Sequence, residues 1–218
     1  MNAESASFPM MVNLRGKKCV VVGGGRIAGD KIAGLLRHGA RIVMVSPRAD
    51  RRVQEQARLR KFEWRRREFS ARDVEGAFLA IAATNSPGVN EAVFRACRAR
   101  GVLCNAVDDP EHCDFFYPAV VRRGPLQIAI STNGCSPALA SRLRQELEQE
   151  FGPEWGAWVE HVGKTRREVL RKEMSPGARR KQLMEMASSR AFREFLRARK
   201  RGDAAVGRRK RESQLRPR

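Results

Sequence analysis

A glycine cluster after the first apolar segment constrains the fold of this chain more than any other feature. Residues 17–22 end in an apolar run of strand length and lead directly into Gly23-x-Gly25-x-x-Ala28, which opens a predicted helix. In such a turn the first glycine permits a tight bend and the second lets the backbone approach a pyrophosphate. The small third residue lets helix and strand pack closely, and the helix N-terminus offers N–H donors to phosphates. The spacing therefore predicts a dinucleotide-binding βαβ unit in preference to a purely structural turn.

Alternating strand and helix patterns continue to residue 114. Further strands are predicted at 41–46, 62–65, 78–83 and 102–107, with helices at 27–38, 53–60 and 89–100. Gly39 is the predicted C-terminal stop of the first helix. This alternation requires a parallel sheet with helices on its faces. We therefore expect an α/β fold with a Rossmann-type parallel sheet.

The pattern changes after residue 114. Two predicted strands, 115–121 and 126–131, are joined by a turn at residues 122–125 and form a β-hairpin. Ser136 and Pro137 then suit the N-cap and first position of a helix that ends near Phe151. Only helical patterns follow. The predicted domains are a Rossmann domain at 1–114, a hairpin and helix module at 115–151, a helical module at 152–196, and a basic, disordered tail at 197–218.

The end of the second predicted strand leaves the choice of nicotinamide cofactor open. An acidic residue about 20 positions after the glycines usually bonds the ribose of NAD, whereas an arginine there accommodates the 2′-phosphate of NADP. This chain has Ser46, Pro47 and Arg48 instead. Ser46 is able to bond a ribose hydroxyl and Arg48 is able to accept a 2′-phosphate. The residues alone do not distinguish NAD from NADP.

A second site signal lies at the carboxyl end of the strand predicted at 102–107. The segment from Asn105 to Pro110 carries Asp108 and Asp109, and ligands of open parallel sheets bind outside such strand ends. A carboxylate here could accept a proton while hydride leaves for the cofactor. Asp109-Pro110 is better interpreted as a turn, and for Asp108 both interpretations stay open. No metal site is predicted, since the neighbouring His112-Cys113-Asp114 lacks metal-binding spacing.

The chain is strongly basic, with a net charge of +20, of which the tail at 197–218 carries +8. Such a tail either binds nucleic acid or is a solubilising extension, and its composition favours the second interpretation. The remaining +12 suits a polyanionic ligand. The candidate cations are Arg122, Arg123, Arg142 and Arg144.

Cysteine content and hydropathy indicate a cytoplasmic protein. The five cysteines are odd in number and irregularly spaced, which is typical of a reducing compartment. No apolar run approaches the roughly 20 residues needed to cross a bilayer. The first seven residues include an acid and lack the basic start of a signal peptide. We expect no membrane association.

Several separated motifs occur together in a recognisable order. They are Phe8-Pro9, Val21-Val22-Gly23-Gly24-Gly25, Ala82-Ala83-Thr84-Asn85, Asn105-Ala106-Val107-Asp108-Asp109, Cys113-Asp114-Phe115, Pro118-Ala119, Arg123-Gly124-Pro125-Leu126, Ala129-Ile130-Ser131-Thr132 and Ser136-Pro137-Ala138-Leu139-Ala140. In this order and spacing, the chain resembles the precorrin-2 dehydrogenase/sirohydrochlorin ferrochelatase family, the N-terminal module of siroheme synthases. The resemblance covers about residues 8–150.

The resemblance implies oxidation of precorrin-2, a tetrapyrrole, to sirohydrochlorin with NAD as the hydride acceptor. It implies that Asp108 is the catalytic acid/base and that the protein is a homodimer built through residues 115–151. The cofactor-binding residues are then expected to be Gly23, Gly25, Arg26, Ile27, Ala28, Ser46, Pro47, Ala83 and Thr84. Substrate contacts are expected from Asn105, Ser131 and Thr132. Insertion of ferrous iron to give siroheme stays open, as do iron versus cobalt and siroheme versus cobalamin as the destination.

Two departures from the family pattern affect these expectations. Asn133 replaces the first glycine of a Ser-Ser/Thr-Gly-Gly loop, and asparagine tolerates a positive φ better than most residues. Thr132 matches a position that is a phosphorylated serine in some fused members, so modification there is an open question. No methyltransferase domain fits in 218 residues, so precorrin-2 is expected from a separate uroporphyrinogen methyltransferase.

An alternative to the enzyme is an NAD-sensing regulatory module whose basic tail binds nucleic acid. Binding of nucleic acid is not expected, because this alternative leaves the match at Asp108 and at residues 131–140 unexplained.

Overall fold

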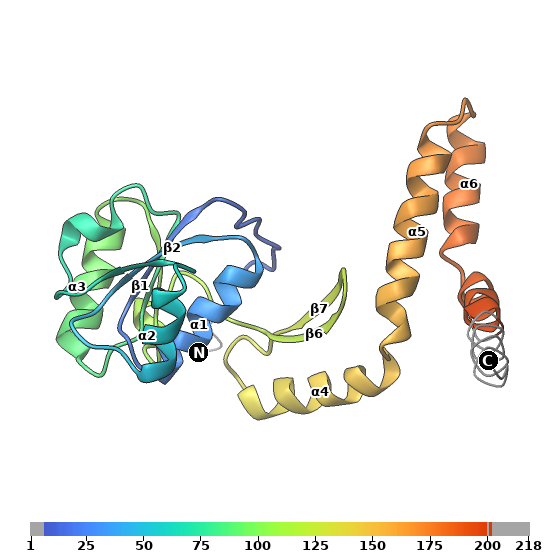
Figure 1. The fold of residues 1–218 in the computed structure, drawn as a ribbon. Coiled ribbons are helices and arrows are strands. Elements are labelled where there is room, and N and C mark those ends of the chain that lie inside the picture. Colours follow the sequence, from blue (N-terminus) through green and yellow to red (C-terminus); the bar gives the residue numbers. More distant parts are fainter. Residues whose placement is uncertain (1–6, 200, 202–218) are drawn as a thin grey trace, which may run out of the picture. The chain divides into compact units, whose positions relative to one another are not determined.

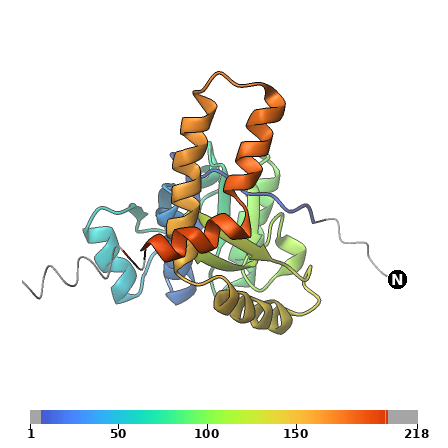
Figure 2. The ribbon, with the colours of Figure 1, turned by 90° about the vertical axis from the view of Figure 1, so that its right-hand side faces the viewer.

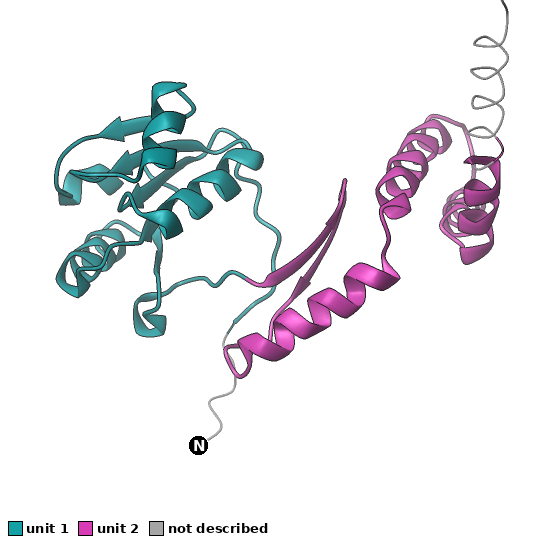
Figure 3. Cartoon of the chain, turned by 60° about the horizontal axis from the view of Figure 1, so that its bottom comes forward, with its two compact units in different colours: residues 1–117 teal, residues 118–218 magenta. Residues whose placement is uncertain are grey.

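The structure, a computed structural model, describes residues 7–199 and 201. The chain divides into two compact units, residues 1–117 and 118–218 (Figure 3). The division lies three residues after the predicted end of the Rossmann domain. Most of the predicted tail, residues 200 and 202–218, lies outside the described residues, whereas 197–199 continue a helix that begins at residue 189. No helix in the described ranges combines the length and apolar character needed to cross a membrane.

A five-stranded parallel sheet forms the centre of the first unit (Figure 1). Its strands are β1 (Lys18–Val22), β2 (Arg41–Val45), β3 (Glu63–Arg65), β4 (Leu79–Ala82) and β5 (Leu103–Ala106). Their order is β3-β2-β1-β4-β5, so the chain reverses its direction across the sheet between β1 and β4. This is the strand order of a dinucleotide-binding sheet, in which ligands bind at the reversal. The predicted α/β class and Rossmann-type sheet are confirmed.

Helices cover both faces of this sheet because alternate strand residues point to opposite sides. The helices are α1 (Arg26–Arg37), α2 (Arg51–Arg58) and α3 (Pro87–Arg98), with short 3₁₀ turns at Ala71–Val74 and Pro110–His112. Val20 and Val22 belong to the core on the α3 side, and Val21 belongs to the core on the α1 and α2 side. All three are at most 2% exposed, which explains why β1 is apolar at every position after Lys18.

The second unit consists of a β-hairpin followed by helices. Its elements are β6 (Ala119–Arg123), β7 (Leu126–Ile130), α4 (Pro137–Glu150), α5 (Glu154–Leu170) and α6 (Pro176–Met186), and residues 189–199 are also helical. Figure 2 shows α5 and α6 as an antiparallel pair. Ser136 caps α4 as predicted, because its side chain accepts a hydrogen bond from the backbone of Leu139 at 3.2 Å.

The hairpin is present, but its predicted start and turn were wrong. The first strand begins at Ala119 and not at residue 115, because Phe115 packs into the core of the first unit and its carbonyl accepts a hydrogen bond from Asn105. The turn is shorter than predicted, since Arg122 and Arg123 pair with β7. Only residues 124–125 remain as the loop, with φ of +55° at Gly124, as a two-residue hairpin connection requires.

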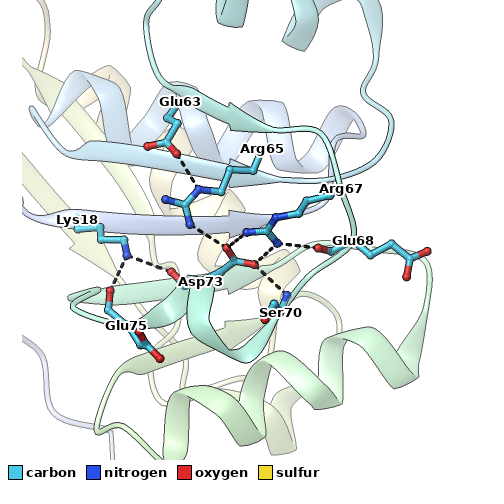
Figure 4. A network of polar contacts seen from close by, with 8 residues as sticks. All are labelled: Lys18, Glu63, Arg65, Arg67, Glu68, Ser70, Asp73 and Glu75. Atoms are coloured by element: carbon cyan, nitrogen blue, oxygen red, sulfur yellow. Dashed lines mark hydrogen bonds and ion pairs between the residues drawn. The ribbon is translucent and has the colours of Figure 1, made fainter.

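Asp73 is the centre of a polar network at the β3 end of the first unit (Figure 4). Its carboxylate accepts hydrogen bonds from the guanidinium groups of Arg65 at 2.9 Å and Arg67 at 2.8 and 2.5 Å, and from the Ser70 backbone at 2.9 Å. The ammonium group of Lys18 donates to the Asp73 carbonyl. Burial acts to raise the pKa of Asp73, but the hydrogen bonds from Arg67, Ser70 and Arg65 outweigh it and lower this pKa to about 2. The network ties β1, β3 and the following 3₁₀ turn together.

Asp73→Asn is expected to lower the free energy of unfolding by about 1–3 kcal/mol at neutral pH, the usual contribution of hydrogen bonds to charged groups. Because the folded pKa of about 2 lies below the ordinary 3.8, the contribution is complete above about pH 4 and is lost as the pH falls toward 2. Urea denaturation across this range measures it. Asp30→Asn is the control, because its exposed ion pairs with Arg26 and Arg52 at 3.9 Å contribute at most about 1 kcal/mol. Equal losses in both variants would contradict a special role for Asp73.

Candidate active site

Two glycines of the β1–α1 turn allow three loops to meet at the carboxyl edge of the sheet. Gly23 has a φ of +119°, and a Cβ there would lie 2.2 Å from the Ala83 carbonyl oxygen after β4. A Cβ on Gly24 would lie 2.3 Å from the Arg48 carbonyl oxygen after β2. The Gly24 carbonyl also accepts a hydrogen bond from the Asp50 backbone at 2.8 Å. Any side chain at these positions would force the loops apart.

Gly25 differs from its neighbours because a Cβ there would meet nothing within 4 Å. It is the N-cap of α1, its φ is −80°, and no side chain caps the helix. Arg26 and Ile27 are exposed at this end, whereas Ala28 is fully buried against the sheet, so it has the packing role predicted for the third small residue. An open backbone approach at the start of a 12-residue helix fits a pyrophosphate. The fingerprint residues therefore fit a dinucleotide.

Ser46 and Pro47 follow β2 beside this turn. The Ser46 hydroxyl donates a hydrogen bond to the Arg48 carbonyl at 2.5 Å, and the indole N–H of Trp64 donates to the Ser46 carbonyl at 2.9 Å. With its proton engaged, the Ser46 hydroxyl is left to accept a hydrogen bond from a ribose hydroxyl. Pro47 and Arg48 are exposed. This edge lacks the usual carboxylate, as its sequence indicated.

Asn90, which the sequence analysis missed, holds the loop that carries Ala83 and Thr84. The Thr84 hydroxyl donates to the Asn90 side-chain oxygen at 2.8 Å, and the Asn90 side-chain nitrogen donates to the Thr84 carbonyl at 3.2 Å. Asn90 is 7% exposed. A buried amide among the apolar positions of α3 was the available signal, because buried polar groups require partners. The loop after β4 is thereby fixed to α3.

Asp108 lies just beyond the carboxyl end of β5, exposed and with a φ of +62°. Aspartate is among the few non-glycine residues that adopt this left-handed conformation readily. The adjoining Val107 backbone donates to the Ala82 carbonyl at 2.9 Å, which fixes this loop to the end of β4. Asp109 instead pairs with His112 at 2.5 Å and begins the 3₁₀ turn at Pro110–His112, in agreement with its interpretation as a turn residue. Asp108 and the glycine turn thus follow strands that flank β4.

The three predicted substrate contacts have different surroundings. Asn105 is 7% exposed, and its side-chain nitrogen donates to the Cys113 sulfur at 3.2 Å and to the Phe115 carbonyl at 2.9 Å, so it holds the segment after the 3₁₀ turn. Ser131 and Thr132 lie in the second unit, in the loop between β7 and α4. Their hydroxyl oxygens accept backbone hydrogen bonds from Asn133 and Ser136, both at 3.1 Å.

The loop that carries Ser131 and Thr132 accommodates Asn133. Asn133 has a φ of +50° and Gly134 a φ of +82°, as expected for a position that glycine normally fills. The tolerance of asparagine for a positive φ is confirmed.

The arginines proposed from net charge are engaged within the second unit. Arg123 donates to the Phe151 carbonyl at 2.7 Å and the Glu148 carbonyl at 2.8 Å, so it joins β6 to the end of α4. Along α4, Arg142 pairs with Glu146 at 3.2 Å and Arg144 pairs with Glu148 at 2.7 Å. Arg122 donates to the Gln127 side chain at 3.1 Å. Within the described ranges, no group of three His, Cys, Asp or Glu side chains could hold a metal ion.

Comparison with known proteins agrees with this geometry. The family described as "Putative NAD(P)-binding" matches residues 10–119, and the family described as "Sirohaem biosynthesis protein central" matches residues 123–150. The siroheme synthase of Nitrosococcus oceani is 36% identical over 173 residues, which is 79% of this chain and 37% of that protein. The siroheme biosynthesis protein met8 of Schizosaccharomyces pombe is 34% identical over 158 residues, which is 71% of this chain and 60% of that protein.

The chain belongs to the NAD(P)-binding family of sirohaem biosynthesis proteins. A solved structure titled "SirC, precorrin-2 dehydrogenase" agrees, with a TM-score of 0.74, 28% sequence identity, and coverage of 88% of this chain and 98% of that one. The resemblance inferred from the separated motifs is therefore confirmed. The chain spans only 37% of the length of the Nitrosococcus siroheme synthase it matches.

The two ends of the glycine motif are expected to respond differently to a methyl group. Gly23→Ala should destabilise the fold for two reasons. The new Cβ would clash with the Ala83 carbonyl, and the positive φ of residue 23 is strained for alanine. Gly25→Ala should cost at most about 1 kcal/mol of stability, the scale of an N-cap change, yet weaken NAD binding roughly tenfold or more by obstructing the approach to the helix N-terminus. Thermal unfolding and calorimetric titration with NAD measure the two effects. Unchanged NAD affinity in a folded Gly25→Ala variant would refute the assigned pyrophosphate position.

Proposed function

We propose that this chain is an NAD-dependent dehydrogenase that converts precorrin-2 to sirohydrochlorin. The observation that carries the proposal is the position of Asp108 at the carboxyl end of β5, on the same sheet edge as the open turn at Gly25. Family membership adds the substrate class, since the structural relative is titled a precorrin-2 dehydrogenase. Ligands of this sheet type bind at the edge where these residues lie.

In this proposal NAD would supply the hydride acceptor, while the protein positions the substrate and the cofactor and takes up the proton. Gly25 and the first turn of α1 would hold the pyrophosphate, and Arg26 and Ile27 are the exposed residues that follow Gly25. Ser46 would accept a hydrogen bond from a ribose hydroxyl, with Pro47 next to it in the chain. Ala83 and Thr84 line the side beyond β4, in a loop that Asn90 keeps rigid.

Asp108 acts as the general base. Removal of two hydrogens from precorrin-2 gives one hydride and one proton, so a group is needed for the proton as the hydride departs. An exposed carboxylate held by a fixed loop meets this need, because among the described residues Asp108 has no salt bridge to break before it reaches a bound substrate. Its neighbour Asp109 lacks that freedom, because it is paired with His112.

Substrate contacts are proposed from Ser131 and Thr132, whose hydroxyl protons remain available for donation after accepting backbone hydrogen bonds. Asn105 acts by holding the segment beside Asp108, since its nitrogen is committed to Cys113 and Phe115. Phosphorylation of Thr132 would replace a donor with negative charge, which opposes binding of a polycarboxylate.

A homodimer built through residues 115–151 is part of the proposal. A two-stranded sheet is marginally stable by itself, and β6 and β7 pair only with each other among the described residues. Pairing with the same hairpin of a second copy would extend this sheet.

The proposed setting is the cytoplasm, with precorrin-2 supplied by a uroporphyrinogen methyltransferase activity. All five cysteines are free, as in a reducing compartment. Ferrochelation is a second activity to be tested with ferrous iron as a substrate, because Asp108 could also accept pyrrole protons. The same assay with cobalt would compare the two metals.

Asp108→Asn is expected to retain NAD affinity and to lower dehydrogenase turnover at least a hundredfold, the usual scale of losing a general base. Asparagine is preferred to alanine because both native and new residues tolerate the φ of +62°. The measurement follows the absorbance of enzymatically generated precorrin-2 under anaerobic conditions, with NAD, with NADP or without a cofactor. Ferrous iron is then added to test for metal insertion.

Asp109→Asn is the matched control, because it removes the neighbouring carboxylate and should leave turnover nearly unchanged. NAD-dependent formation of sirohydrochlorin by the wild-type chain supports the dehydrogenase. Full turnover by Asp108→Asn would overturn the role of Asp108, and a wild-type chain inactive with both cofactors would overturn the function itself.

A further inference from the structure

Lys31 is a half-buried cation on α1 that neither the predicted motifs nor the proposed mechanism uses. Its ammonium nitrogen lies 3.6 Å from the centroid of the Tyr117 ring, so an aromatic face fixes the position of the charge. Within residues 7–199 and 201, Lys31 forms no ion pair with an acidic side chain. A positive charge is therefore held in place without a partner carboxylate.

The surroundings of Lys31 connect it to Asp108. Burial lowers the pKa of Lys31, and the negative charges of Asp108 and Asp30 act in the opposite direction. Burial also raises the pKa of the Tyr117 hydroxyl, so the ring beneath the ammonium group remains neutral. Partial desolvation makes such a cation a stronger binder of an incoming anion than a surface lysine.

We propose that Lys31 is a further substrate-binding residue, which holds a carboxylate of the tetrapyrrole beside Asp108. The inference rests on the proposed function, because it takes its anion from the polycarboxylate substrate. The cofactor pyrophosphate is a less suitable partner, since Lys31 lies five residues after Arg26 and thus about 7.5 Å along α1 from the first residue of that helix. Phosphates bind at the first turn itself.

The proposal also accounts for the charge that an anionic substrate meets. A polycarboxylate approaching Asp108 is repelled by that carboxylate, and a fixed cation next to it offsets the repulsion. Among the charged residues after residue 117, Arg123, Arg142 and Arg144 already have partners within their own unit. Over residues 7–117, Lys31 is the cation that is both positioned by an aromatic ring and electrostatically linked to Asp108.

The test compares Lys31→Met, Lys31→Arg and the wild-type chain in the precorrin-2 assay. Loss of one charge-assisted contact should raise the KM for precorrin-2 about tenfold or more, and should change kcat less than about threefold. The affinity for NAD should not change. Lys31→Arg should recover most of the loss, because it keeps the charge.

Lys17→Met is the matched control. Lys17 is another lysine of the first unit that lies over an aromatic ring, with its ammonium nitrogen 5.5 Å from the centroid of the Phe78 ring. Its replacement removes one positive charge at a position distant from Asp108. Its KM for precorrin-2 should equal that of the wild-type chain. If Lys31→Met and Lys17→Met raised the KM equally, the change in net charge would explain the effect. That result would overturn the specific role of Lys31.

A second measurement separates this inference from the proposed function. Titration of each protein with sirohydrochlorin, followed by the ligand's own absorbance, reports tetrapyrrole binding without turnover. About tenfold weaker binding by Lys31→Met supports the role of Lys31, even if the wild-type chain proves inactive as a dehydrogenase. Unchanged tetrapyrrole affinity and KM, or a loss of NAD affinity instead, would overturn it. Thermal unfolding of each variant shows whether it is folded, and Lys31→Gln replaces Lys31→Met if that variant is not.

Discussion

The contact between Gly23 and the Ala83 carbonyl is the constraint on which the sheet edge depends. It allows β1 and β4 to be neighbours while the loops that follow them leave toward opposite faces. Gly24 makes an equally close approach to the loop after β2. With three loops fixed in this way, the N-terminus of α1 remains open at Gly25. The binding edge thus follows from close backbone packing, which side chains at these glycines would prevent.

Much of this edge could be predicted from sequence because its determinants are local. The spacing of Gly23, Gly25 and Ala28 specifies a turn, a helix start and a packing contact within six residues. The apolar runs of the strands follow from burial of the sheet on both faces. The same local reasoning was wrong at residues 115–118, where Phe115, a residue with high strand propensity, is held by the core of the first unit. Tertiary contacts there outweighed intrinsic preference.

The supporting polar groups could not be predicted because their partners are distant in sequence. Asp73 resembles an ordinary surface aspartate until two arginines and the Ser70 backbone surround it. Asn90 acquires its role only when α3 brings it under the loop after β4. Both side chains are buried and hydrogen-bonded, so they stabilise one loop arrangement without contacting a ligand themselves.

The charged residues that recognise a ligand are likewise hard to predict from the sequence, because their partners are distant in sequence. The net charge of the body pointed toward a polyanionic ligand, but the number of cations does not reveal which of them remain available. Arg123 serves as a structural tie, whereas Lys31 is held over an aromatic ring with no acidic partner among the described residues. An arginine that already satisfies backbone carbonyls would have to break those hydrogen bonds to bind a carboxylate. A lysine held in position without an ion pair among the described residues has no such hydrogen bonds to break, so recognition of an anion depends on unpaired placement more than on total charge.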